Sequence, residues 1–239
     1  MKPFHFKQFS IQQDKCAMKI GTDGVLLGAW ATVENAQTIF DIGTGTGLIA
    51  LMLAQRNTQV TINAIEIDEA AFLQARDNFK NSPFATRLNI IHQSIQTYAN
   101  TSSSRYDLII SNPPFFIKNK GTNSNQKNRQ IARQTNLLTH TELLDCVLKL
   151  LSIEGRFCVI LPYLEGLNFI QQAKIKSLFC NKMIEVRGRI EKPIERLLLE
   201  FSRQDLPLIR EELVIQKSSK RHDYTPKYIN LTKDFYTIL

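Results

Sequence analysis

Three glycines at alternate positions in the stretch Asp41–Gly47 are the first candidates for chemistry; they are Gly43, Gly45 and Gly47. The stretch leaves a predicted buried strand over residues 38–42 and enters a predicted helix over residues 48–55. Glycines there let the backbone turn sharply and approach a ligand closely, because no Cβ intervenes. Their G-x-G-x-G spacing differs from the G-x-G-x-x-G that seats a pyrophosphate, and no Walker lysine follows. The loop therefore predicts a ligand-binding turn and argues against a nucleoside triphosphate.

Two carboxylates are predicted to face the same turn. Asp41 precedes the glycines, and an anion there suits the ammonium or sulfonium group of S-adenosylmethionine but suits a pyrophosphate badly. Glu66 follows the next predicted strand, residues 60–65, where a carboxylate can accept both ribose hydroxyls of a bound adenosine. Asp68 is the weaker candidate, since it is placed to cap the predicted helix over residues 69–81. Charge and glycine spacing together predict S-adenosylmethionine rather than NAD.

A predicted strand over residues 106–111 ends in a rigid polar turn made of Ser111, Asn112, Pro113, Pro114 and Phe115. The two consecutive prolines fix an extended backbone that lacks two N–H donors. The carbonyls and the Asn112 side-chain oxygen can accept hydrogen bonds from an NH₂ group, which aims its nitrogen lone pair at a donor methyl. Phe115 offers a face for stacking a planar substrate. A simple strand terminator beside a core aromatic is the alternative interpretation.

The elements that must position these residues alternate between strand and helix, as in a parallel sheet covered by helices on both faces. Further strands are predicted over residues 88–92 and 157–161, and further helices over 143–151 and 167–179. Residues 182–189 and 194–202 then read as two strands joined by a short turn, and such a hairpin must be antiparallel. The chain is therefore predicted to be α/β, with a mostly parallel sheet that ends in an antiparallel pair.

Asp41–Gly47, Glu66 and Asn112–Phe115, in this order and spacing, resemble the class I methyltransferases that modify amino groups. The resemblance implies a Rossmann-like fold with a mostly parallel seven-stranded sheet, a C-terminal antiparallel hairpin and S-adenosylmethionine as cofactor. It implies one methyltransferase domain over residues 1–239, divided into a cofactor-capping extension (1–36), a catalytic core (37–205) and a C-terminal extension (206–239). Adenine-N6, guanine-N2 and glutamine-amide methyltransferases share the Asn-Pro-Pro-Phe motif, which leaves the substrate open.

Softer similarities outside the core resemble bacterial tRNA1(Val) (adenine-37-N6) methyltransferases over nearly the whole chain; they include Phe9, residues 19–28, Arg129, Arg133, Leu143, Leu144 and residues 234–236. This resemblance implies that Thr22, Asp23 and Gly24 cap the methionine end of the cofactor. One position departs from the pattern: Ser94, or else Gln93, stands where many relatives place an aspartate that contacts the cofactor adenine. A hydroxyl or an amide can still accept that hydrogen bond.

A basic loop directly after the proline turn is the feature that favours RNA; its cations are Lys118, Lys120, Lys127, Arg129 and Arg133. These side chains would meet phosphates close to the substrate nitrogen. A second basic stretch, residues 217–228, carries Tyr224 and Tyr228, which could stack on unpaired bases. Either stretch could instead be a solvated surface loop. The target adenine of such an RNA would be turned outward from a single-stranded loop.

Composition narrows the class of protein further. The formal charge of +8 and pI of about 9.4 are compatible with an anionic partner. Cys16, Cys146, Cys158 and Cys180 are too widely spaced for a zinc site or a disulfide framework, so we expect reduced thiols and no metal. No stretch of consecutive apolar residues is close to the length of about 20 that a membrane-spanning helix needs. The N-terminus also lacks the apolar core of a signal peptide. We therefore expect a cytoplasmic protein, most simply a monomer, that does not bind membranes.

These observations predict a methyltransferase for the N6 amine of a tRNA adenine. Another RNA amine, such as a ribosomal RNA guanine N2 or adenine N6, and a protein glutamine amide are the alternative acceptors. A noncatalytic RNA-binding protein on a methyltransferase scaffold is the non-enzymatic alternative.

Overall fold

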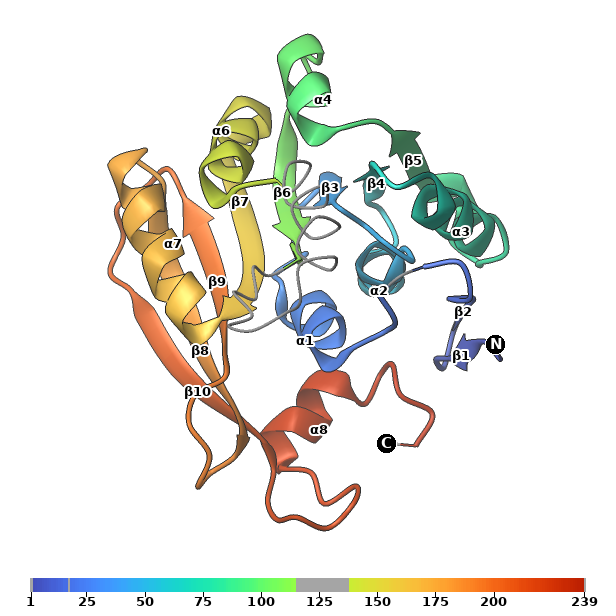
Figure 1. The fold of residues 1–239 in the computed structure, drawn as a ribbon, viewed down its shortest axis with the longest axis vertical. Helices are drawn as coiled ribbons and strands as arrows, with labels where there is room; N and C mark the ends of the chain where they lie inside the picture. Colours follow the sequence, from blue (N-terminus) through green and yellow to red (C-terminus); the bar gives the residue numbers. More distant parts are fainter. Residues whose placement is uncertain (1, 17, 115–137, 239) are drawn as a thin grey trace, which may run out of the picture.

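The computed structural model describes residues 2–16, 18–114 and 138–238. Within them, eight strands form one sheet in the order β10-β8-β9-β7-β6-β3-β4-β5 (Figure 1). The strands are β3 (Thr38–Ile42), β4 (Thr61–Glu66), β5 (Leu88–His92), β6 (Tyr106–Ser111), β7 (Leu151–Pro162), β8 (Phe179–Arg189), β9 (Arg196–Ser202) and β10 (Ile209–Gln216). A separate antiparallel pair near the N-terminus consists of β1 (Phe4–His5) and β2 (Ser10–Ile11).

Helices cover both faces of this sheet, as predicted. They are α1 (Thr22–Trp30), α2 (Leu48–Arg56), α3 (Glu69–Lys80), α4 (Ile95–Thr101), α6 (His140–Leu150), α7 (Tyr163–Ile175) and α8 (Pro226–Thr232), with a 3₁₀ turn at Ala85–Arg87. Side chains of α1, α2 and α8 belong to one apolar core and those of α4, α6 and α7 to the other. Ile39 and Phe40, neighbours on β3, point into these two different cores, which is why the strand reads as a continuous apolar run.

Local signals fix where several helices begin. The Asp68 carboxylate accepts a hydrogen bond from the Ala71 amide at the start of α3. Thr139 and Glu142 form a capping box at the start of α6. The prediction placed one helix at residues 167–179, four residues too far along the chain. The observed helix α7 begins directly after Pro162 and ends before Ser177, whose φ of 57° lies in the left-handed region.

The sheet has eight strands where seven were predicted, because β10 was assigned to the C-terminal extension. Its residues read Ile-Arg-Glu-Glu-Leu-Val-Ile-Gln and bury only Leu213, which is the pattern of an edge strand rather than a core strand. The antiparallel hairpin is confirmed, since β9 pairs antiparallel with both β8 and β7. Because β9 is antiparallel to both β7 and β8, those two strands run in the same direction. β8 and its parallel neighbour β10 therefore run parallel to the central strands. All strands of this sheet except β9 therefore end at one edge, which we call the carboxyl edge, and β9 begins there.

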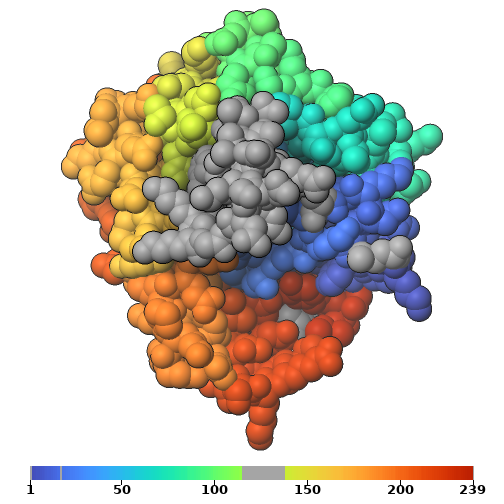
Figure 2. Space-filling model, viewed as in Figure 1, coloured from blue at the N-terminus to red at the C-terminus, as the bar shows by residue number. Residues whose placement is uncertain are grey.

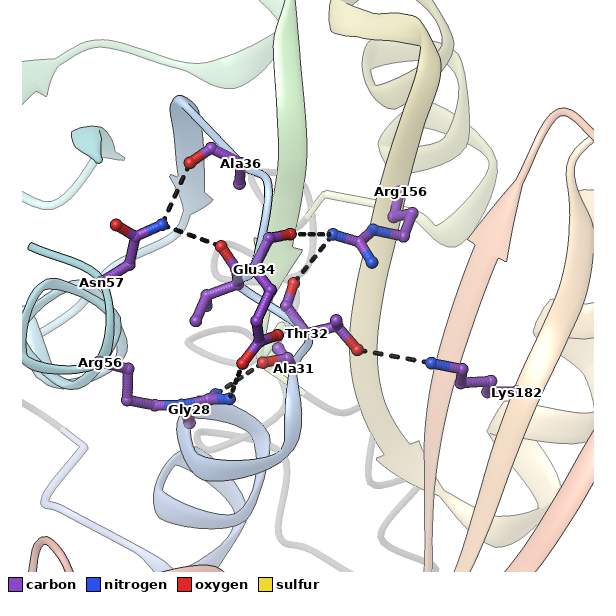
Figure 3. Close-up of polar contacts among 10 residues, drawn as sticks. Gly28, Ala31, Thr32, Glu34, Ala36, Arg56, Asn57, Arg156 and Lys182 are labelled. Atoms are coloured by element: carbon purple, nitrogen blue, oxygen red, sulfur yellow. Dashed lines mark hydrogen bonds and ion pairs between the residues drawn. The ribbon is translucent and has the colours of Figure 1, made fainter. Parts of the chain in front are cut away.

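The opposite edge is closed by the segment that joins α1 to β3, and three side chains satisfy its carbonyl groups (Figure 3). Arg56 Nη1 donates hydrogen bonds to the carbonyls of Gly28 (3.0 Å) and Ala31 (2.6 Å). Asn57 Nδ2 donates to Val33 and Ala36, and Arg156 Nη2 donates to Thr32 and Glu34. Burial lowers the pKa of Arg56, and the nearby Glu34 carboxylate opposes that shift. The segment thus depends on side chains from α2 and β7 rather than on regular structure of its own.

This arrangement predicts that Arg56→Met destabilises the fold. Methionine keeps an apolar stem of similar reach but leaves the Gly28 and Ala31 carbonyls without their donor, at a cost of about 2–3 kcal/mol in free energy of unfolding. Urea denaturation followed by circular dichroism measures this change. Arg76→Met on the exposed side of α3 is the matched control, and an equal effect of both substitutions would contradict the role given to Arg56.

Candidate active site

The three glycines of the loop after β3 all adopt positive φ angles, 70° at Gly43, 58° at Gly45 and 83° at Gly47. Such angles favour glycine over residues that carry a Cβ. A Cβ on Gly47 would lie 2.4 Å from Phe79 Cε1, so packing requires that glycine. A Cβ on Gly43 or Gly45 would meet nothing within 4 Å. Those two positions therefore border open space at the carboxyl edge, as a cradle for a ligand requires.

The Glu66 carboxylate ties this loop to the end of β4. Its Oε2 accepts a hydrogen bond from the Gly45 amide at 2.9 Å. Its Oε1 accepts from the amides of Ile67 and Asp68, both at 2.9 Å. A carboxylate oxygen offers about two accepting positions, so Oε1 is filled while Oε2 keeps one for a ligand hydroxyl. Asp68 caps α3, the structural role that the sequence favoured for it.

Asp41 lies wholly inside the protein, in contact with Thr44 of the loop. Its Oδ2 accepts a hydrogen bond from Thr44 Oγ1 at 2.6 Å, while Oδ1 has no hydrogen-bond partner among the described residues. Burial raises the pKa of Asp41 to about 7, and the hydrogen bond from Thr44 opposes that rise. A buried carboxyl with this pKa becomes more readily ionised when a cation binds nearby. These features suit the cationic groups of S-adenosylmethionine.

A strap formed by residues 12–16 and 18–20 crosses from α3 to α1, and two buried polar residues of α3 hold its first part. Asn78 accepts a hydrogen bond from the Gln12 amide and donates to the carbonyls of Gln12 and of Thr46 in the glycine loop, each at 2.9 Å. Gln74 Oε1 accepts from the Lys15 amide at 3.0 Å. Burial raises the pKa of the Cys16 thiol to about 11, and the neighbouring Glu66 carboxylate adds to the rise. The strap therefore passes beside the carboxylate that anchors the loop.

The sequence interpretation missed Asn78 and Gln74. Both lie on the buried face of α3 that also carries Ala71, Ala75 and Phe79. A polar side chain on an otherwise apolar helix face must find partners inside the protein, so this pattern was the available signal.

A cavity of about 380 Å³ opens beside Asn112 at the end of β6. Its walls include Thr22 and Asp23 from α1, together with Arg196 at the start of β9. Asp23 Oδ2 accepts a hydrogen bond from Arg196 Nε at 2.8 Å, which joins α1 to the far half of the sheet. Gly24 lets α1 approach closely, since a Cβ there would lie 3.0 Å from Leu48 Cδ2 and 3.8 Å from Asn112 Nδ2. The structure thus brings the predicted N-terminal residues to the predicted amine clamp.

Other predicted site residues have different outcomes. Pro113 is buried and Pro114 is exposed. Phe115 and the cations Lys118, Lys120, Lys127, Arg129 and Arg133 lie outside the described residues. Ser94 is the N-cap of α4, where its hydroxyl accepts from the Thr97 amide at 3.2 Å and donates to Thr97 Oγ1 at 2.8 Å. Its predicted contact with the cofactor adenine stays a prediction.

The second basic stretch behaves differently from what its composition indicated. Tyr228 is only 3% exposed and packs in the core, so the expectation that it stacks on an RNA base was wrong. Lys227 is paired with Glu211 at 2.7 Å. The sequence could not distinguish Tyr228 from a solvent-facing residue because its burial depends on the packing of α8 against α1 and β10.

No group of three or more His, Cys, Asp or Glu side chains suited to a metal occurs within residues 2–16, 18–114 and 138–238. All four cysteines are unpaired, and only Cys180 is partly exposed. In the same part of the chain, no helix has the length and apolar character needed to cross a bilayer.

The family described as "Methyltransferase small domain" matches residues 18–150, which include the glycine loop, Glu66 and Asn112. Among solved structures, a predicted O-methyltransferase from Agrobacterium tumefaciens superposes with a TM-score of 0.68 at 15% identity, over 89% of this chain and 96% of that one. A ribosomal protein L11 methylase from Lactobacillus delbrueckii gives 0.50 at 18% identity, over 76% and 77%. These likenesses establish the Rossmann-like methyltransferase fold.

Curated relatives are similar over nearly their whole length. The tRNA1(Val) (adenine(37)-N6)-methyltransferase of Trichodesmium erythraeum is 47% identical over 98% of this chain and 97% of its own. The proteins of that name from Flavobacterium psychrophilum and Proteus mirabilis are 48% and 45% identical, each over 98% of this chain. This chain therefore belongs to the tRNA1(Val) (adenine(37)-N6)-methyltransferase family.

Proposed function

We propose that this protein transfers a methyl group from S-adenosylmethionine to the exocyclic N6 amine of an adenine in tRNA, namely adenosine 37 in the anticodon loop of tRNA1(Val). The observation that carries the proposal is the 42–48% identity to enzymes of that name over 98% or more of this chain. The location of Asn112 beside a cavity at the carboxyl edge supports it, because ligands of parallel α/β sheets bind at that edge.

The methyl donor is S-adenosylmethionine, which supplies an electrophilic methyl on a sulfonium. The residues proposed to hold it are Thr22, Asp23, Gly24, Asp41, Gly43, Gly45, Gly47, Glu66, Ser94 and Asn112. The open space at Gly43 and Gly45 supports this assignment, and so do the unpartnered Asp41 oxygen and the remaining accepting position on Glu66 Oε2. The main-chain bonds to Glu66 fix that carboxylate before a ligand arrives, so binding requires little reorganisation.

The catalytic residues are proposed to be Asn112, Pro113, Pro114 and Phe115. The Asn112 side-chain oxygen would accept a hydrogen bond from the substrate amine and orient its lone pair, so that rate enhancement comes mainly from positioning. Phe115 would stack on the target base. The methylated amine loses its proton readily, so the reaction needs no strong general base, and Asp41 is too deeply buried to supply one.

Several further properties belong to the same proposal. Lys118, Lys120, Lys127, Arg129 and Arg133 would contact RNA phosphates near the target. The chain would act as a monomeric single domain in the cytoplasm, with residues 1–36 capping the cofactor, residues 37–205 forming the catalytic core and residues 206–239 forming an extension that adds β10 to the sheet.

The decisive experiment offers labelled S-adenosylmethionine with total tRNA or with ribosomal proteins, followed by mass spectrometry of modified nucleosides. We expect N6-methyladenosine in tRNA1(Val). Label confined to protein, or to another nucleoside, would refute the proposal.

Asn112→Ala is expected to lower kcat/KM for tRNA by about 100-fold or more, because the amine loses the group that orients it. The dissociation constant of S-adenosylmethionine, measured by calorimetry, should change by less than about threefold, since the glycine loop and Glu66 remain. Asn230→Ala, on the exposed side of α8, serves as the control. A tenfold loss of cofactor affinity without loss of kcat would contradict the assigned role.

Asp41→Asn is expected to remove a pH dependence from both folding and cofactor binding. The pKa of Asp41 is about 7 in the folded protein and ordinary (about 3.9) when unfolded, so the native state holds an extra proton between these values. Free-protein stability should therefore fall as pH rises through that window. Cofactor affinity should rise over the same range, because a cation favours the ionised carboxyl.

Calorimetry in buffers of different ionisation enthalpy measures the proton released on binding at about pH 6. Wild type should release a proton that Asp41→Asn does not, and the variant should bind the cofactor about tenfold more weakly at pH 8. The exposed Asp145→Asn variant should keep the wild-type profile. Equal proton release by wild type and Asp41→Asn would assign the titration to another group.

A further inference from the structure

The loops that follow β8 and β10 leave the sheet side by side at the carboxyl edge. The loop over residues 190–195 joins β8 to β9, and the loop over residues 217–224 joins β10 to α8. Gln216 is the register partner of Arg189, so the two strands end together (Figure 1). In the space-filling view the hairpin region and the C-terminal region adjoin on one face (Figure 2). We refer to these two segments as the edge loops.

The edge loops are continuous with the proposed catalytic cavity. Gly188 and Ile215, which flank the loops, and Glu195, the last residue of the first loop, line the same cavity as Asn112. A substrate held at Asn112 therefore has the edge loops beside it. This continuity places the loops within reach of the rest of a tRNA rather than at a remote surface.

The cations on this part of the chain divide into two groups. Cations on the strands and on α8 are neutralised, since Arg187 pairs with Glu212, Arg210 with Glu185, and Lys227 with Glu211. Cations on the edge loops are not: within the described residues, no carboxylate pairs with Lys192, Lys217, Lys220 or Arg221, and all four are exposed. The Asp223 carboxylate, which lies in the same loop, instead accepts a hydrogen bond from Ser218 Oγ at 2.6 Å.

Hydrogen bonds within the second edge loop fix the path of its backbone. The Lys217 amide donates to the Asp223 carbonyl at 2.8 Å, and the Asp223 amide donates to the Lys220 carbonyl at 3.3 Å. His222 closes the turn with a φ of 64°. The Tyr224 ring packs on the buried Tyr228 at 4.8 Å between centroids, which attaches the end of the loop to the core. The loop is therefore a tethered turn that projects Lys217, Lys220 and Arg221 outward.

We propose that the edge loops form a tRNA-docking surface in which Lys192, Lys217, Lys220 and Arg221 bind backbone phosphates outside the target nucleotide. The inference rests on the proposed function, and it concerns residues other than the basic loop after Phe115. Exposed cations that lack a protein partner release counterions when they meet phosphates, which favours binding without reading sequence. The edge loops thus set the orientation of the tRNA while Asn112 selects the reacting amine.

The test compares two triple variants with the same number of lysines and arginines removed. The edge variant is Lys217→Gln, Lys220→Gln and Arg221→Gln. The control variant is Lys80→Gln, Arg105→Gln and Lys174→Gln, three exposed cations at the opposite edge of the sheet. Filter binding measures the tRNA dissociation constant as a function of salt, and methyl transfer gives kcat and KM.

The edge variant should bind tRNA at least about tenfold more weakly than wild type. The slope of the logarithm of its tRNA association constant against the logarithm of salt concentration should be smaller in magnitude by about two to three. Its KM for tRNA should rise while kcat at saturation and the S-adenosylmethionine dissociation constant stay near wild type. The control variant should match wild type in all five quantities. If the edge variant fails to fold by circular dichroism, Lys220→Glu alone should still weaken tRNA binding, because only its backbone serves the turn.

Two failures are distinguishable. If wild type methylates tRNA and the edge variant keeps the wild-type KM and salt slope, the docking surface is wrong and the proposed function stands. If wild type methylates no tRNA, the proposed function is wrong and the docking surface is overturned with it. Equal losses in the edge and control variants would indicate nonspecific attraction and would also overturn the docking surface.

Discussion

The three hydrogen bonds accepted by the Glu66 carboxylate are the interaction on which the site depends most. They join the amide of Gly45 to those of Ile67 and Asp68, so the loop after β3 and the turn after β4 form one unit. Asn78 extends this unit to the strap through its bonds to Thr46 and Gln12. A carboxylate fixed by main-chain donors cannot rotate freely, and this rigidity means that a ligand finds its acceptor already oriented.

The direction of β9 is the second constraint, because it determines which residues share the carboxyl edge. A strand antiparallel to both its neighbours returns β8 and β10 to the direction of the central strands. The cavity beside Asn112 consequently receives Arg196 from the start of β9 and Gly188 from the end of β8. The ion pair between Asp23 and Arg196 then joins α1 to β9 in the wall of that cavity.

Features that depend on neighbouring residues were predictable from the sequence, and features that depend on distant partners were not. The positive φ angles of the glycines, the cap at Asp68 and the hairpin after β8 follow from local residue types. β10 was missed because an edge strand need not alternate apolar and polar residues. Arg196 and Asn78 gain their roles only through partners more than thirty positions away. Tyr228 was misread because the burial of a helix face depends on what packs on it.

The same distinction explains why a formal charge of +8 says little about where an anion binds. The cations on the strands of the C-terminal half already have carboxylate partners, so a phosphate approaching them must compete with an existing pair. The cations of the edge loops face water, and a phosphate that binds there displaces only counterions. Asp41 represents the opposite case, since its carboxyl is buried away from water and its ionisation is favoured by a single cation bound nearby. A cationic cofactor and an anionic substrate can therefore bind the same edge of one sheet because burial separates the groups that attract them.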